Sequence, residues 1–280
     1  MARAGELWRD ALDRLRRAGV PNPSRDALLL LADAFGAEKA QVLAHPEWDL
    51  PEEGALRLEE ALRRRVAREP LQYIRGFQPF WTFRVAVGPG CLIPRPETEH
   101  LLEAALDHLR PRRRPRAAEA GTGSGALLRA LAQERPDGRF TGLEREGQAL
   151  AWSRRNLEGL ANVLLVQGDL ERAPLAPGLH LLLANPPYVT DSEWDSLPPE
   201  VRLYEPSAAL RCGPDPLAPY RALGRTAAET LVRGGILACE VGVAQARRAP
   251  ALRRIHRKLE WLEGRRDLSG RLRVAVWARA

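Results

Sequence analysis

From residue 116 onward, short apolar runs alternate with helical patterns, and this alternation constrains the fold more than any other feature. The runs are "RAAEA" (116–120), "RFTGLE" (139–144), "NVLLVQ" (162–167), "LHLLLA" (179–184) and "GILACEV" (235–241). Helical patterns lie between them at 125–134, 147–158 and 217–232. Strands that alternate with helices favour a parallel sheet covered on both faces. Two more strands are expected within 261–280, so the sequence predicts an α/β fold.

The first 76 residues have a different pattern, which predicts a small all-helical domain. Apolar residues recur at helical spacing within 3–19, 22–36 and 51–69. Residues 77–90 then alternate in polarity and end in Gly-Pro-Gly, which is typical of a strand or hairpin. We therefore expect a helical domain at 1–76, a linker or β-hairpin at 77–95, and a second domain at 96–280.

Composition and charge limit the classes of function. The 280-residue chain has three cysteines, and they form neither a CxxC pair nor a zinc-binding spacing, so no metal site is predicted. The net charge is +7, yet residues 1–80 carry 13 basic and 13 acidic side chains, which argues against a DNA-recognition domain there. Residues 1–20 lack the apolar core of a signal peptide, and no apolar stretch reaches the ~20 residues of a membrane helix. A cytoplasmic protein with no membrane partner is expected.

A glycine-rich loop, "EAGTGSG" (119–125), joins the first strand of the second domain to its first helix. Glycines there allow a tight turn and a close approach of ligand to backbone. Glu144, at the end of the second strand, is placed to accept hydrogen bonds from ribose hydroxyls, and Asp169 follows the third strand where an adenine amino group would lie. These features are shared by nicotinamide enzymes and adenosylmethionine enzymes, and a glycine loop that serves packing alone is the plainer alternative.

Residues 185–188, "NPPY", follow the fourth strand at the edge where ligands bind in such folds. Pro186 and Pro187 have no N–H, so their carbonyls face outward without a competing donor. Asn185 adds a side-chain carbonyl, and Tyr188 adds a flat aromatic face. A rigid set of acceptors beside an aromatic wall suits a planar –NH2 group, so this corner favours an enzyme that methylates nitrogen. A plain Pro-Pro turn is the structural alternative.

The order of motifs extends this interpretation to the whole chain. "PLQYIRGFQPFW", "LIPRPETE", "EAGTGSG", "GLE", "GDL", "NPPY" and "RLYEPSAAL" follow one another after the helical domain. In this order the chain resembles the PrmC/HemK family, the peptide chain release factor N5-glutamine methyltransferases. NPPY alone is shared with adenine-N6 DNA methyltransferases and some rRNA methyltransferases, whereas LIPRPETE together with YEPSAAL is much more specific.

The resemblance implies a Rossmann-like, seven-stranded class I methyltransferase sheet with its last strand reversed, preceded by a helical substrate-docking domain. It implies S-adenosylmethionine as cofactor, with S-adenosylhomocysteine as product, bound by Gly121, Thr122, Gly123, Ser124, Gly125, Glu144, Asp169, Leu170 and Asn185. The glutamine of the Gly-Gly-Gln loop of bacterial class-1 release factors would lie against the substrate-binding residues Asn185, Pro186, Pro187 and Tyr188. Asn185, Pro186 and Tyr188 would be the catalytic residues. A monomer without direct sequence-specific nucleic-acid binding is expected.

Several positions depart from the family's usual pattern or leave alternatives open. Glu119 and Glu144 stand where the family usually has Asp, and Leu170 stands where an aromatic residue is frequent. Arg95 in LIPRPETE either lines the pocket or braces it through Glu97 and Glu99. YEPSAAL is interpreted as a structural wall. An adenine-N6 nucleic-acid methyltransferase, a cofactor-sensing binding protein and a nicotinamide enzyme remain as alternatives.

Overall fold

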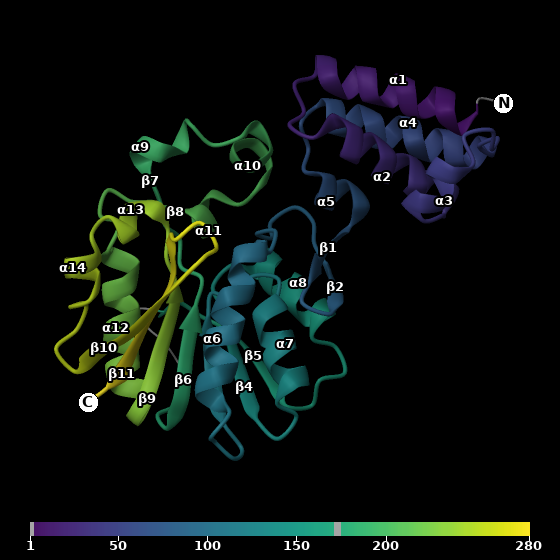
Figure 1. The fold of residues 1–280 in the computed structure, drawn as a ribbon. Helices are drawn as coiled ribbons and strands as arrows, with labels where there is room; N and C mark the ends of the chain where they lie inside the picture. The colour runs from purple at the N-terminus through teal and green to yellow at the C-terminus, as the bar shows by residue number, and fades with distance from the viewer. Residues whose placement is uncertain (1–2, 171–174) are drawn as a thin grey trace. The chain divides into compact units, whose positions relative to one another are not determined.

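The structure is a computed structural model and describes residues 3–170 and 175–280. The chain divides into two compact units, whose elements are labelled in Figure 1. Met1–Phe77 and Pro198–Tyr204 form the first unit, whereas Gln78–Leu197 and Glu205–Ala280 form the second.

Six helices make up the first unit in the described part of the chain. They are α1 (Ala4–Arg17), α2 (Pro23–Phe35), α3 (Lys39–Ala44), α4 (Glu52–Val66), α5 (Leu71–Arg75) and α10 (Pro199–Tyr204). All of them except α10 contribute to one apolar core. The helices predicted within 3–19, 22–36 and 51–69 are confirmed as α1, α2 and α4. Pro23 begins α2, and Gly36, with a left-handed φ of 65°, ends it. Leu15, Leu31 and Leu62 are fully buried in the core between these helices.

Helix α10 joins the first unit through a buried cluster of charges. The Glu200 carboxylate accepts hydrogen bonds from Arg65 Nη2 at 3.0 Å and from Arg68 Nε and Nη2 at 2.9 and 2.8 Å. Arg65 also donates from Nε to Asp26 Oδ2 at 2.8 Å. Arg65 and Asp26 are almost completely buried. Each charge is therefore stabilised by its ion-pair partner, and removal of one side chain would leave the opposite charge buried without compensation.

A hairpin and one large sheet form the framework of the second unit. The hairpin expected in 77–90 consists of β1 (Phe77–Phe80) and β2 (Phe83–Ala86). The seven-stranded sheet has the order β10-β11-β9-β6-β3-β4-β5 in the described part of the chain. Its strands are β3 (Arg116–Ala120), β4 (Arg139–Glu144), β5 (Val163–Gln167), β6 (Leu179–Ala184), β9 (Leu231–Glu240), β10 (Leu259–Arg266) and β11 (Leu272–Arg279). Strand β11 runs antiparallel to both of its neighbours and the others run in one direction, which confirms the predicted reversed last strand.

Strand β9 is longer than its sequence pattern predicts. It begins at Leu231 instead of residue 235, because Leu231 already pairs with Leu179 of β6. Gly234 and Gly235 resemble a strand-ending turn, but Gly234 adopts a φ of 68° and the register with β6 shifts nearby. The two glycines therefore form an irregularity within β9 and do not end the strand.

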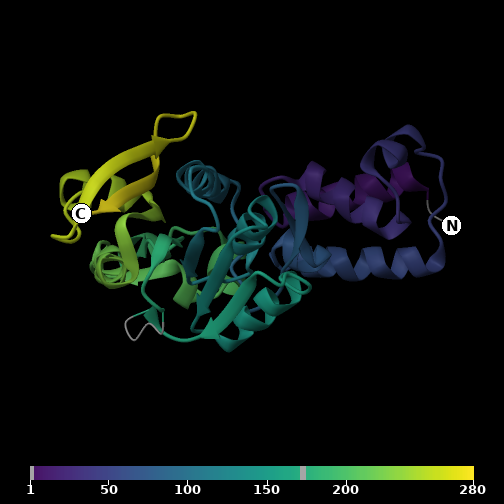
Figure 2. The same ribbon diagram turned by 90° about the horizontal axis from the view of Figure 1, so that it is seen from below.

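Helices cover both faces of this sheet. Helix α12 (Ala218–Thr230) shares a core with Ala118, Leu182, Leu237 and Trp277 of the strands. Helix α6 (Glu99–Leu109) lies on the opposite face, as Figure 2 shows; α7 (Ala126–Glu134) packs beside α6, and α8 (Gly147–Asn156) packs beside α7. Because side chains alternate along a strand, Glu119 and Glu240 point toward the α6 face.

Shorter elements complete the unit. They are η1 (Pro96–Thr98), β7 (Val189–Thr190), α9 (Asp191–Trp194), α11 (Ser207–Leu210), β8 (Arg211–Gly213), α13 (Val243–Ala246) and α14 (Ala249–Leu252). Across residues 3–170 and 175–280, no helix combines the length and apolar character that crossing a bilayer requires.

Candidate active site

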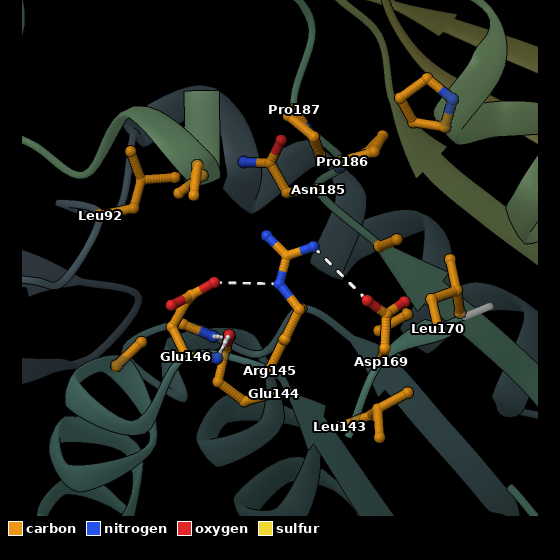
Figure 3. A pocket seen from close by; sticks show the side chains of 18 of the residues that line it. Leu92, Leu143, Glu144, Arg145, Glu146, Asp169, Leu170, Asn185, Pro186 and Pro187 are labelled. Atoms are coloured by element: carbon orange, nitrogen blue, oxygen red, sulfur yellow. Dashed lines mark hydrogen bonds and ion pairs between the residues drawn. The ribbon is translucent and has the colours of Figure 1, made fainter. Parts of the chain in front are cut away.

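The carboxyl ends of β3, β4, β5 and β6 surround a cavity of about 210 Å³ within the second unit (Figure 3). Because the strands are parallel, the loops that follow them emerge at the same edge of the sheet. These loops contribute Gly121, Glu144, Asp169 and Asn185 to the cavity wall. The sequence motifs expected to act together are therefore brought to one place.

The glycine loop after β3 adopts a conformation that favours glycine. Gly121 and Gly123 have φ values of 72° and 55°, where a side chain would be strained, and both line the cavity. Thr122, Ser124 and Gly125 do not belong to the lining. Thr122 and Ser124 are buried, so these three residues shape the loop from behind.

Glu144, at the end of β4, is tied to two neighbouring loops. Its Oε2 accepts a hydrogen bond from the Gly123 N–H at 2.8 Å, and its Oε1 accepts one from the Glu146 N–H at 2.9 Å. The side chain is buried in the cavity wall. Each carboxylate oxygen has two acceptor positions, so both oxygens retain capacity for one more donor.

Glu119 lies behind the glycine loop. Thr122 Oγ1 donates a 2.6 Å hydrogen bond to Glu119 Oε2. Burial, with a smaller contribution from the charge of Glu144, outweighs the opposing Thr122 hydrogen bond and raises the pKa of Glu119 to about 8. A carboxyl with this pKa is largely protonated at neutral pH.

The raised pKa of Glu119 predicts a pH dependence of stability. Its ordinary pKa is 4.5, so between about pH 4.5 and 8 the folded protein holds a proton that the unfolded chain has lost. The free energy of unfolding should therefore fall as pH rises through this window, by up to ~1.4 kcal/mol per pH unit from this group. Glu119→Gln should lack this contribution, which is measured as the difference between parent and variant in urea unfolding at several pH values. Parallel pH profiles of the two proteins would contradict the prediction.

Sequence patterns did not identify Arg145, which lies in the cavity between two acids (Figure 3). Its Nε donates to Glu146 Oε1 at 2.9 Å, and its Nη1 lies 3.5 Å from Asp169 Oδ2. Leu170 lines the wall next to Asp169. Leu170 thus presents an aliphatic surface to the cavity, and the planar guanidinium of Arg145 lies across from it.

The NPPY corner contributes three residues to the cavity and one residue behind it. Asn185, Pro186 and Pro187 line the wall, whereas Tyr188 does not. The Tyr188 carbonyl accepts a hydrogen bond from Gln245 Nε2 at 3.0 Å, and its ring packs against the Cα of Gly242, where an added Cβ would come within 2.9 Å. Burial raises the pKa of Tyr188 well above its usual value, so its phenol stays neutral.

Arg95 braces the site through a partner that the sequence did not suggest. Its Nη2 donates to Glu205 Oε1 at 2.5 Å, and the Ile93 N–H donates to Glu205 Oε2 at 3.0 Å. Glu205 belongs to YEPSAAL and is buried. Pro206, Ala208 and Ala209 of the same segment line the cavity, which agrees with the interpretation of YEPSAAL as a wall.

The residues present fit S-adenosylmethionine. An adenosine needs acceptors for its ribose hydroxyls, a polar partner for its amino group and apolar contact for its rings. Glu144, Asp169 and Leu170 offer these groups around one cavity. No cluster of His, Cys, Asp or Glu arranged to hold a metal ion occurs among the described residues.

Comparisons with known proteins agree with this geometry. Residues 6–76 match the PrmC N-terminal domain, and residues 99–197 match the methyltransferase small domain. The release factor glutamine methyltransferase of Deinococcus radiodurans is 37% identical over 98% of this chain and 98% of its own. That of Moorella thermoacetica is 40% identical over 88% of this chain and 87% of its own.

A solved structure agrees at the level of the fold. The hMettl16 catalytic domain, in complex with MAT2A 3′UTR hairpin 6, matches 82% of this chain and 84% of its own with a TM-score of 0.54 and 14% identity. The sheet order, the reversed strand and the cavity define a class I methyltransferase that uses S-adenosylmethionine. The chain belongs to the release factor glutamine methyltransferase family, as the motifs predicted. The nicotinamide enzyme and the cofactor-sensing binding protein are set aside.

Proposed function

We propose that this enzyme transfers the methyl group of S-adenosylmethionine to the side-chain amide nitrogen, N5, of a glutamine in a bacterial class-1 release factor. The name shared by its relatives supports this substrate. The observation that carries the proposal is that Asn185, Pro186 and Pro187 line the same cavity as Gly121 and Glu144. An acceptor-rich corner for an –NH2 group therefore adjoins a wall suited to adenosine. The Gly-Gly-Gln loop is the proposed source of the glutamine.

In the proposed cofactor site, Glu144 accepts hydrogen bonds from the two ribose hydroxyls with its remaining lone pairs. Gly121 and Gly123 let the backbone approach the cofactor closely, while Thr122, Ser124 and Gly125 maintain the shape of the loop. Asp169 would accept a hydrogen bond from the adenine amino group, and Leu170 would pack against the adenine ring. When bound, S-adenosylmethionine supplies a methyl group carried on a positively charged sulfur.

In the proposed reaction, Asn185 and Pro186 hold the substrate amide by its hydrogens. An amide nitrogen is a poor nucleophile because its lone pair is delocalised into the carbonyl. Acceptance of its two N–H bonds by Asn185 Oδ1 and the Pro186 carbonyl favours a pyramidal nitrogen, whose lone pair points toward the methyl carbon. Methyl transfer would form the C–N bond as the C–S bond of S-adenosylmethionine breaks, with S-adenosylhomocysteine leaving, and the nitrogen would then lose a proton to water. Alignment of this kind supplies on the order of 7 to 11 kcal/mol of the barrier.

Tyr188 and Pro187 complete the proposed substrate site. Pro187 is part of the cavity wall, and the Tyr188 ring, packed against Gly242 behind that wall, supports the backbone of the corner that holds the substrate amide. The neutral phenol of Tyr188 is not a general base, and the proposed mechanism requires none, since the proton leaves after methyl transfer.

We further propose that the first unit docks the release factor and that the enzyme acts as a monomer without direct sequence-specific nucleic-acid binding. The balance of 13 basic and 13 acidic residues in 1–80 favours a protein partner over a nucleic acid. The docking unit then includes α10, because Glu200 is bonded to Arg65 and Arg68.

A fragment that begins at Gln78, which lacks α1 to α5 and keeps only α10 of the docking unit, should separate docking from chemistry. The cavity is lined entirely by residues between Gly90 and Leu223 of the second unit, so the fragment should bind S-adenosylmethionine. Its kcat/KM for intact release factor should fall by about tenfold or more, because a lost docking surface removes binding free energy of ~1.4 kcal/mol per factor of ten. Its rate with a short Gly-Gly-Gln peptide should match that of the full chain. Equal rates of the fragment and the full chain on intact release factor would refute the docking role.

One labelling experiment tests the proposed substrate directly. The protein is incubated with methyl-labelled S-adenosylmethionine, release factor and total nucleic acid, and the labelled polymer is identified. Label in the release factor, lost on Gln→Ala substitution in its Gly-Gly-Gln loop, is the expected result. Label in adenine would instead identify the nucleic-acid methyltransferase that also contains NPPY.

A further inference from the structure

A short chain of hydrogen bonds leads from the Asn185 side chain into the protein interior. Asn185 Nδ2 donates to Thr98 Oγ1 at 3.4 Å, and Thr98 Oγ1 donates to Glu240 Oε2 at 2.7 Å. Thr98 and Glu240 are buried, and neither lines the cavity. Glu240 reaches Thr98 because it points from β9 toward the α6 face of the sheet.

Thr98 ends η1 and directly precedes α6, with helical φ and ψ of −66° and −19°, and its hydroxyl makes no capping hydrogen bond. A capping threonine is extended and accepts a backbone N–H of the first helical turn, which this backbone conformation does not allow. Here the hydroxyl contacts Glu240 and Asn185 instead. Helix capping, which would be a purely structural reason for threonine, therefore does not explain Thr98.

The single hydrogen of the Thr98 hydroxyl sets the direction of the chain. A hydroxyl has one O–H donor and two lone pairs. Burial raises the pKa of Glu240, whereas the Thr98 hydrogen bond and the charges of Arg273 and Arg95 lower it. As a carboxylate Glu240 only accepts, so it takes the Thr98 hydrogen at 2.7 Å and Thr98 presents lone pairs to Asn185. Those lone pairs attract the amide NH2 and repel the amide oxygen. The Asn185 Oδ1 is therefore left as the free end of its amide.

We infer that Thr98 and Glu240 are positioning residues that fix the amide of Asn185 with its oxygen available to the substrate nitrogen. Without them, the Asn185 amide could rotate by half a turn and present its NH2 group to the substrate –NH2, donor against donor. This inference rests on the proposed function for its effect on rate, whereas the orientation of Asn185 itself is independent of the substrate.

Thr98→Val tests the inference, because it keeps the shape of the side chain and removes the hydroxyl. Single-turnover methylation of release factor at saturating S-adenosylmethionine should slow by about tenfold, as expected for one lost oriented hydrogen bond. Thr98→Ser restores the hydroxyl and should stay within about threefold of the parent. Thr230→Val is the matched control, since Thr230 is a buried threonine on α12 whose hydroxyl bonds to the Thr226 carbonyl. That control should leave the rate unchanged.

A double mutant separates positioning from a general structural effect. In an Asn185→Ala background, Thr98→Val should cause no further loss of rate, because the group that it positions is gone. A parental rate for Thr98→Val, or the same tenfold loss in the Asn185→Ala background, would overturn the inference.

A substrate-free measurement keeps the inference distinct from the proposed function. Exchange of the Asn185 side-chain amide hydrogens with solvent, followed by NMR, should be faster in Thr98→Val than in the parent and in Thr98→Ser. Equal exchange in all three proteins would overturn the inference even if release factor proved not to be the substrate. Failure of the parent to methylate release factor would instead reject the proposed function and leave the exchange result to decide the role of Thr98.

Discussion

Asn185→Ala is expected to slow methyl transfer by ~10² to 10³, the usual cost of removing one aligned contact to a reacting group. The substitution deletes the side-chain acceptor but leaves the Pro186 carbonyl and the backbone of the corner in place. Pro186 is buried and follows Asn185 two residues after the end of β6, so the local fold should survive. The variant should bind S-adenosylmethionine within several-fold of the parent. Single-turnover transfer to release factor at saturating cofactor measures the chemical step separately from binding.

Asn185→Asp is the sharper comparison at the same position. It keeps an oxygen close to the substrate nitrogen, so it should retain more activity than Asn185→Ala. It also removes the amide donor that contacts Thr98, and it introduces a charge, so it should remain well below the parent. Parental rates in both variants would show that the NPPY corner is structural in this protein.

The sequence predicted those parts of the fold that depend on local patterns. Periodic apolar residues located α1, α2 and α4, and the alternation after residue 116 located the parallel strands. The positive φ angles of Gly121 and Gly123 agree with the glycine loop predicted after β3. In each case the physical cause, a buried stripe or a backbone conformation that favours glycine, acts over a few neighbouring residues.

Contacts between distant parts of the chain were outside the reach of those patterns. Glu200 contacts Arg68 across 132 residues, and no local signal assigns α10 to the helical unit. The partner of Arg95 proved to be Glu205, 110 residues away, instead of the nearby acids of LIPRPETE. Thr98 and Glu240 are separated by 142 residues. Such pairs follow from strand order and side-chain direction, which become known only with the fold.

The Glu144 contacts explain why its replacement should affect cofactor binding strongly. The carboxylate is proposed to accept two ribose hydroxyls while it already holds the Gly123 and Glu146 N–H groups. Glu144→Ala would remove the two cofactor bonds and leave two backbone donors near the cavity without this partner. The glycine loop and the ribose site are thus coupled through one side chain.

Glu144→Ala should therefore weaken S-adenosylmethionine binding by roughly 1.5 to 3 kcal/mol for each charge-assisted bond lost, or at least on the order of a hundredfold for two. Glu146→Gln is the matched control, because Glu146 lines the same cavity and pairs with Arg145 but is assigned no ribose contact. The control should change affinity by no more than a few-fold, which also excludes a general effect of negative charge in the cavity. Calorimetric titration of both variants, after circular dichroism has established that they are folded, gives the comparison. An unchanged dissociation constant in folded Glu144→Ala would remove Glu144 from the cofactor site, and equal weakening in both variants would assign the effect to charge instead of to hydrogen bonding.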